Sequence, residues 1–317
     1  MTRASALSFR HLVFAAFVVV VWGVNFTVIE IALEGFPPIL FAALRFALVA
    51  LCCLVVPRPK VAWRYLVLVG LFTGTGQYAL LFLGMAAGMP PGISSLVLQA
   101  QVLLTLLVAA TALRERPTRR QLLGVSIAVV GLVVVGFNRG GTVPLVALLL
   151  VLAAATSWAI GNVCTRAARP DDGFRLTIWS CLVPPVPLFL LSIATEDADR
   201  GIAAIADADT TTWLALGYVV VFATILALGV WSTLLGNYPA HKVVPFALLI
   251  PVIGIPTGWL VEGDVVTLPM LAGALVVLAG LYFVTTRARV DRAAARNRCL
   301  TSSGEVGDQE VPEHGHP

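Results

Sequence analysis

Residues 18–30 read VVVVWGVNFTVIE and give the first indication of the fold, because they hold an asparagine inside a long apolar run. A related segment, LAAATSWAIGNVCTR, follows at residues 152–166. A buried amide costs free energy in an apolar environment unless it has a hydrogen-bond partner. Asn25 and Asn162 occupy similar places in the two halves of the chain, which predicts a duplicated membrane protein with a polar centre.

The composition also indicates a membrane protein. The 317 residues are 59% hydrophobic and 12% charged, and the mean hydropathy is +0.93. Apolar runs long enough to cross a hydrocarbon core of about 30 Å recur along the chain. We therefore predict an all-α membrane protein with ten transmembrane helices. The predicted spans are residues 12–33, 38–56, 65–87, 91–113, 120–137, 142–165, 174–194, 212–235, 243–262 and 267–286.

The basic residues gather on one side of the predicted spans. If the N-terminus is cytoplasmic, every lysine and arginine lies on the cytoplasmic side except Arg45, Arg139 and Arg200. Cytoplasmic loops of membrane proteins are enriched in these residues. We therefore predict a multi-pass protein of the cytoplasmic membrane, surrounded by membrane lipid, with both termini in the cytoplasm. The net charge of +4 follows from this topology and indicates no nucleic-acid partner.

The second half of the chain repeats features of the first. Gly124 and Gly131 are each followed 149 positions later by another glycine, Gly273 and Gly280. Five spans per half is an odd number, so the second half would enter the membrane from the opposite side. This predicts an inverted repeat, a pattern typical of transporters with a substrate site near the midplane. The predicted boundaries are 8–140 for the first five-helix repeat, 141–287 for the second and 288–317 for a disordered cytoplasmic tail.

Short polar motifs stand within or beside the predicted spans: WGVNF (22–26), LRF (44–46), GMPPGISSLVLQAQ (88–101), RERPTRRQLLG (114–124), SWAIGN (157–162), IWS (178–180), FATILALGVWSTLLGNY (222–238) and VVPFALLIPVIG (243–254). Through these motifs the chain resembles the EamA family of the drug/metabolite transporter superfamily, over nearly all of residues 8–287. It looks closest to the branch that exports O-acetylserine and cysteine. The resemblance implies ten spans, an inverted repeat and export by alternating access. Relatives in this branch commonly have a lysine near the position of Glu30, where this chain has the opposite charge.

Uncharged polar and aromatic side chains within the spans are candidates for the substrate site. Amides and hydroxyls suit a small zwitterion such as an amino acid, whose two charges need donors and acceptors but little net countercharge. Each residue could instead form a hydrogen bond between helices. Gln99 and Gln101 are two positions apart on a helix, so they cannot both point straight at one cavity. The candidate substrate-binding residues are Asn25, Gln77, Tyr78, Gln99, Gln101, Trp158, Asn162, Trp179 and Trp231.

Two charged residues stand near the predicted outer ends of the first two spans. Arg45 is the only basic residue well inside a span, and Glu30 lies on the preceding helix. At about 1.5 Å rise per residue, the two groups lie within about 5 Å of each other in depth. One interpretation is an ion pair that is structural or gates the outer side. The other is that each side chain reaches separately to the membrane interface.

The leading hypothesis is a secondary transporter that exports small amino acids such as cysteine and O-acetylserine. A proton is one candidate for the coupling ion. A drug or other metabolite exporter of the same superfamily is the alternative. A membrane-embedded enzyme is disfavoured because the four histidines are terminal or in loops and no catalytic dyad or metal cluster stands within the spans. We expect no cofactor and no metal, and the chain has no Walker-type phosphate loop.

Overall fold

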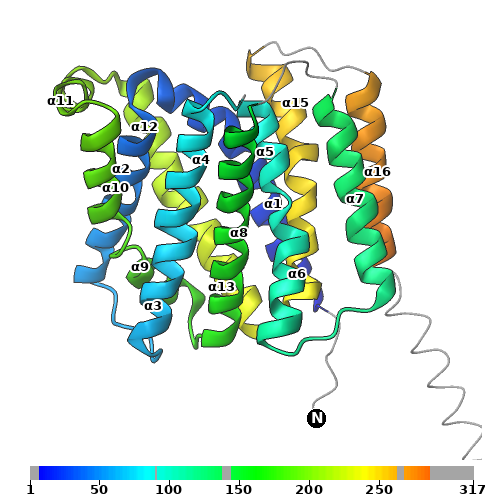
Figure 1. Cartoon of the computed structure of the whole chain (residues 1–317). Coiled ribbons are helices and arrows are strands. Elements are labelled where there is room, and N and C mark those ends of the chain that lie inside the picture. Colours follow the sequence, from blue (N-terminus) through cyan, green and yellow to red (C-terminus); the bar gives the residue numbers. More distant parts are fainter. Residues whose placement is uncertain (1–6, 90, 138–143, 263–267, 286–317) are drawn as a thin grey trace, which may run out of the picture.

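The computed structural model describes residues 7–89, 91–137, 144–262 and 268–285. In these ranges the chain is helical and has no strand, which confirms the predicted all-α class, and the helices stand side by side in a bundle (Figure 1). The first half contains α1 (Phe9–Gly35), α2 (Pro38–Leu51), η1 (Cys52–Leu54), α3 (Trp63–Val69), η2 (Gly70–Gly76), α4 (Gln77–Ala86), α5 (Pro91–Leu98), α6 (Gln101–Ala112) and α7 (Arg119–Phe137). The second half contains α8 (Leu145–Ala168), α9 (Gly173–Ser180), α10 (Pro185–Thr195), α11 (Ala198–Asp207), α12 (Thr210–Tyr218), η3 (Val219–Leu228), α13 (Gly229–Asn237), α14 (Ala240–Val243), η4 (Val244–Leu249), α15 (Ile250–Glu262) and α16 (Leu268–Thr285).

The helices have the length and surface of membrane spans. Within the described ranges, four continuous helices are long and apolar enough to cross a membrane, and α9 with α10 makes a fifth candidate that is bent by 40°. Many large apolar side chains are exposed, which is unfavourable in water and expected against lipid. Helical segments occupy all ten predicted ranges, but the number that cross the membrane stays a prediction. The four long helices are Phe9–Gly35, Trp63–Ala86, Leu145–Ala168 and Thr210–Asn237.

The first and last helices begin and end at the same end of the bundle. In Figure 1 the beginning of α1, the loop between α6 and α7, and the end of α16 lie at one end, and α11 lies at the other. An even number of crossings requires this arrangement of the first and last helices. That this end faces the cytoplasm stays a prediction, and the predicted tail at 288–317 lies outside the described residues.

The two halves carry the same helix irregularities at matching positions. The third helix of each half contains a π-helical stretch, η2 and η3, and these begin 149 positions apart, at Gly70 and Val219. The fourth helix of each half is interrupted as well, between α5 and α6 at Gln99–Ala100 and by the 3-10 segment η4. π-helical turns and broken membrane helices are frequent at functional sites and beside cavities.

Helices α7 and α16 pack together in a way that relates the two halves. They stand side by side (Figure 1), with Gly131 against the carbonyl of Gly273 and Gly280 against the carbonyl of Gly124. Exchanging the two halves converts one contact into the other, as in a self-complementary two-fold interface. Small residues allow such close approach of membrane helices. This symmetry supports the repeat seen in the sequence.

Packing of α8 on η2 depends on Gly161, which leads to a first prediction. A Cβ atom at this position would overlap the Thr73 hydroxyl and lie 3.1 Å from its backbone nitrogen. Gly161→Ala should therefore lower the free energy of unfolding by about 1–3 kcal/mol. Thermal melting of the purified protein measures this change. The matched control is Gly217→Ala in α12, where a Cβ meets nothing within 4 Å. Equal melting temperatures for the two variants would contradict the packing described.

Candidate functional site

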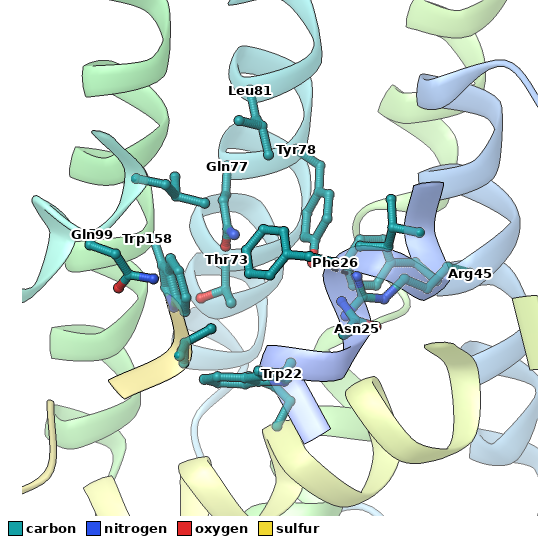
Figure 2. Close-up of a pocket in the computed structure, with 15 residues that line it drawn as sticks. Trp22, Asn25, Phe26, Arg45, Thr73, Gln77, Tyr78, Leu81, Gln99 and Trp158 are labelled. Atoms are coloured by element: carbon teal, nitrogen blue, oxygen red, sulfur yellow. Dashed lines mark hydrogen bonds between the residues drawn. The ribbon is translucent and has the colours of Figure 1, made fainter. Parts of the chain in front are cut away.

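A cavity of about 80 Å³ lies in the interior of the bundle, walled by side chains from both halves (Figure 2). A cavity needs about 10–15 Å³ on this measure to hold one water molecule, and this cavity is several times larger than that minimum. The π-helical stretches η2 and η3 each contribute to its walls, through Thr73 and Leu228. Two regions of irregular helix therefore help to bound the cavity, beside regular segments such as α1 and α4.

Five of the predicted substrate-binding residues line this cavity, and three of them have buried polar atoms without a hydrogen-bond partner among the described residues. These atoms are Asn25 Oδ1, Gln99 Oε1 and Trp158 Nε1. Nearly all buried polar groups in native proteins are hydrogen-bonded, so several orphans around one cavity indicate a place for a polar ligand or water. The other two predicted residues are Gln77 and Tyr78.

Arg45 on α2 also reaches the cavity, and only 3% of its surface is exposed. Its Nε donates to Thr224 Oγ1 at 2.6 Å, and its Nη1 donates to the hydroxyl of Tyr78. The guanidinium lies over two rings, with its carbon 4.9 Å from the centre of Tyr78 and 5.3 Å from that of Phe46. Thr224 donates in turn to the carbonyl of Val219, five residues earlier in η3. The π-helical geometry of η3 thus positions Thr224 Oγ1, which accepts the hydrogen bond from Arg45 Nε.

Glu30 is not the partner of Arg45 in this structure. It is exposed on α1, whereas the described contacts of Arg45 are with the hydroxyls and rings of Thr224, Tyr78 and Phe46. Sequence spacing gave the depth of the two residues but not their direction around the helix axes. An ion pair in another state of the molecule stays a prediction.

A second group of predicted residues forms a hydrogen-bonded cluster beside the cavity. Asn162 Oδ1 accepts from Trp231 Nε1 at 2.9 Å. Asn162 Nδ2 lies 3.1 Å from Gln101 Oε1 and 3.3 Å from Thr105 Oγ1. Gln101 therefore bonds to α8 while Gln99 lines the cavity, which is the division expected from their spacing. Asn162 and Trp231 also line a smaller pocket of about 20 Å³ that shares wall residues with the main cavity.

Three indole rings stand where the two pockets meet. The centre of the Trp22 ring lies 5.8 Å from that of Trp158 and 5.3 Å from that of Trp231. Trp22 Nε1 donates to the carbonyl of Ala223 at 3.0 Å. Trp22 belongs to the WGVNF motif but was not among the predicted site residues. Thr224 was missed too, and its only signal was a hydroxyl within an apolar run.

Trp179 lies away from both pockets, contrary to its predicted role in substrate binding. Its Nε1 donates to the carbonyl of Val56 at 3.0 Å, and its ring contacts Trp63 at 6.0 Å. The helix that holds Trp179, α9, is short and bends by 40° into α10. This residue therefore packs against the segment that follows η1 instead of facing the interior.

The two halves are joined by a charged cluster at the end of the bundle where α1 begins. Glu115 Oε1 accepts from Arg166 Nε at 2.9 Å, and its Oε2 accepts from the backbone nitrogen of Ala240 at 2.9 Å. Arg166 also donates to the carbonyl of Gly236 at 3.1 Å. His241 Nδ1 lies 3.6 Å from Oε2, which is longer than a hydrogen bond. We call Glu115, Arg166, Ala240 and His241 the Glu115 cluster; it was not predicted from the sequence.

The surroundings of Glu115 favour its ionised form. Burial by itself would raise the pKa of this carboxyl, but His241, Arg166 and the amide of Ala240 together hold the pKa below its usual value. A lowered pKa means that the charged group stabilises the fold at and above the usual carboxyl range. This stabilisation is lost only as the pH falls through the lowered value. The Glu115 cluster should therefore be intact at neutral and mildly acidic pH.

Removing this charge gives a second prediction. Glu115→Gln should lower the free energy of unfolding at neutral pH by about 1.5–3 kcal/mol, because it weakens hydrogen bonds to a charged group. The difference between the wild type and the variant should shrink as the pH falls below the usual carboxyl pKa. Melting curves at several pH values measure both effects. The control is Arg175→Gln, which removes an exposed ion pair with Asp172. Wild-type stability of Glu115→Gln at neutral pH would refute the cluster.

A helical membrane protein with a central cavity that holds a few buried polar side chains, walled by both halves of the chain, has the architecture of a transporter. The chain belongs to the EamA-like transporter family, which matches residues 10–137 and 145–286. The family fits the helical membrane fold and the central cavity.

Similar proteins cover almost the same length. The "Probable amino-acid metabolite efflux pump" of Salmonella typhimurium (strain LT2) is 41% identical over 288 residues, which cover 88% of this chain and 96% of the relative. A protein of the same description from Escherichia coli (strain K12) is 39% identical, covering 85% of this chain and 93% of the relative. A protein of known crystal structure aligns with a TM-score of 0.71 and 19% identity, over 88% of this chain and 98% of that chain. This last likeness concerns the fold alone.

Proposed function

We propose that this protein is a secondary transporter that exports small amino-acid metabolites, such as cysteine and O-acetylserine, across the cytoplasmic membrane. The observation that carries the proposal is the central cavity with its unpartnered buried atoms on Asn25, Gln99 and Trp158. The descriptions of the two similar efflux pumps support the same substrate class. A cavity of about 80 Å³ is small, which suits a small amino acid better than a bulky drug.

Transport would proceed by alternating access of two inverted repeats, residues 8–140 and 141–287. The described state supports one step of this cycle. The cavity is lined by Ile29 and Leu81, which lie toward the ends of α1 and α4 that are opposite the Glu115 cluster. The cluster joins the halves at the end predicted to be cytoplasmic, so that side is held closed. Loading from the cytoplasm would then require the cluster to separate while the outer side closes.

Uptake into inverted membrane vesicles tests this function, because export from a cell appears as uptake in that geometry. Vesicles that contain the wild type should accumulate labelled cysteine or O-acetylserine above vesicles from cells without the protein. Imposing and removing a pH gradient tests whether a proton is the coupling ion. The variant Gly217→Ala should behave as the wild type, since the position is open and lies outside the cavity. Accumulation of neither compound would overturn the proposal.

A further inference from the structure

We propose that Arg45 binds the carboxylate of an α-amino acid in the cavity, and that the Asn25 amide oxygen accepts a hydrogen bond from its ammonium group. Gln99 and Trp158 would receive the polar end of its side chain. This inference rests on the proposed function, because it takes the cavity as the substrate site. It adds an orientation for the substrate and a chemical class: small α-amino acids with a polar side chain.

The charge of Arg45 is the first observation. Arg45 is the one charged residue among the described residues that line the cavity, and it is almost completely buried. An arginine cannot lose its proton in a protein, so its charge persists. Its described partners, the hydroxyls of Thr224 and Tyr78, are neutral. A buried charge without a counter-ion is unfavourable, so an anionic group of a ligand is favoured beside it.

The geometry of Arg45 selects a carboxylate. A guanidinium has five N–H donors, and the described hydrogen bonds use Nε and Nη1. Nη2 makes no hydrogen bond within the described part of the chain, so its N–H groups are available to a ligand. The planar fork of an arginine matches the two oxygens of a carboxylate. Thr224 and Tyr78 hold the fork in place before a ligand arrives.

The neighbouring amide supplies the complementary group. Figure 2 shows Asn25 and Arg45 on the same side of the cavity, and Asn25 Oδ1 is buried without a partner among the described residues. An α-amino acid carries its ammonium and carboxylate groups on one carbon atom. An acceptor beside the carboxylate site is therefore where the ammonium group needs one, and Asn25 provides it without adding a charge.

The opposite side of the cavity can recognise the side chain of the substrate. Figure 2 shows Gln99 and Trp158 across the cavity from Arg45. Gln99 Oε1 is an acceptor and Trp158 Nε1 is a donor, and both are buried and unpartnered among the described residues. A thiol, hydroxyl or ester group at this place would satisfy one or both atoms. A purely apolar side chain would leave both unpaired, which disfavours it.

A structural role for Arg45 is the competing interpretation, since it links α2 to η3 and α4 through Thr224 and Tyr78. If Arg45 has only a structural role, replacing it should lower stability but leave the preference of the protein for particular ligands unchanged. If Arg45 binds the substrate carboxylate, replacing it should remove the preference for ligands that carry a carboxylate. The preference for an acid over its ester therefore separates the two roles.

The experiment measures competition against labelled cysteine uptake, with L-cysteine, its methyl ester, cysteamine and 3-mercaptopropionate as competitors. For the wild type, the ester and cysteamine should compete about 30-fold or more weakly than cysteine, because they leave a buried charge unpaired. Arg45→Gln should weaken cysteine by a similar factor and remove most of this preference. Arg45→Lys keeps the positive charge and should retain part of the preference for cysteine over its methyl ester. Asn25→Leu should narrow the difference between cysteine and 3-mercaptopropionate.

Ligand-induced shifts in melting temperature of the purified variants give a second readout that needs no transport. Arg175→Gln is the matched control, because this arginine is partly exposed outside the cavity, and it should keep the wild-type preference. If the wild type transports cysteine but the ester competes equally well, the inference is wrong and the proposed function stands. The same holds if Arg45→Gln keeps the acid-over-ester preference. If Arg45→Gln does not fold, Arg45→Lys decides, and an undiminished preference there contradicts a bidentate anchor. Absence of any transport by the wild type sinks the proposed function itself.

Discussion

Asn162→Leu should lower the free energy of unfolding by about 2–4 kcal/mol and abolish transport. Asn162 accepts from Trp231 and donates toward Gln101 and Thr105, all in the buried interior. Leucine fills similar space but leaves the Trp231 N–H and the Gln101 oxygen without these partners. Trp231 would then shift, and with it the indole cluster beside the cavity. Thermal melting of purified protein and uptake by inverted vesicles measure the two effects.

The matched control for this substitution is Asn237→Leu at the end of α13. Asn237 is exposed, and its side chain donates to the carbonyl of Thr233 at 2.8 Å, its one hydrogen bond among the described residues. Its replacement should leave stability and uptake close to those of the wild type. If the two leucine variants have the same stability and the same uptake, the central role of Asn162 is wrong.

Cross-linking the halves at the Glu115 cluster should stop transport almost completely. Glu115→Cys and Arg166→Cys, combined in a protein whose native cysteines are replaced by alanine, put two thiols where the side chains now meet. A short thiol-specific cross-linker would then hold the cytoplasmic end closed. Alternating access needs this end to open, so trapped protein cannot load substrate. A cleavable linker should restore uptake when it is cut.

Each single cysteine variant, treated with the same reagent, is the control for chemical damage and should keep its untreated activity. Uptake by the double variant without the reagent shows how much activity is lost when the ion pair alone is removed. Full uptake by quantitatively cross-linked protein would mean that the halves do not separate here during the cycle. Substrate would then have to leave the cytoplasm by another path.

The helical membrane fold could be predicted because the length and hydrophobicity of each apolar run can be read directly from the sequence. The apolar runs located the helices, and the beginning of α1 and the end of α16 lie at one end of the bundle (Figure 1), as an even number of spans requires. The π-helical turns were not predicted, since they arise when helices pack together. The glycines at 70, 74 and 76 show where a helix is weak but not how it will distort.

The site was predicted less completely, for geometric reasons. Helical spacing separated Gln99 from Gln101, and the structure separates them too, although the helix is interrupted between them at Gln99–Ala100. It could not fix the rotation of one helix against another, so it offered Glu30 as one possible partner of Arg45 and gave no sign of Thr224. The contact of Glu115 with Arg166 joins residues from different halves, and no local pattern reveals it.

The most direct test of the central claim is counterflow by the purified protein in proteoliposomes that are preloaded with unlabelled cysteine or O-acetylserine. The account predicts that the wild type and Gly217→Ala take up the labelled compound faster than protein-free liposomes. It also predicts that Asn25→Leu, which removes a cavity acceptor, is strongly impaired although it inserts and folds. No exchange by the wild type would contradict export of these metabolites by this chain. Wild-type exchange by Asn25→Leu would contradict the cavity as the substrate site.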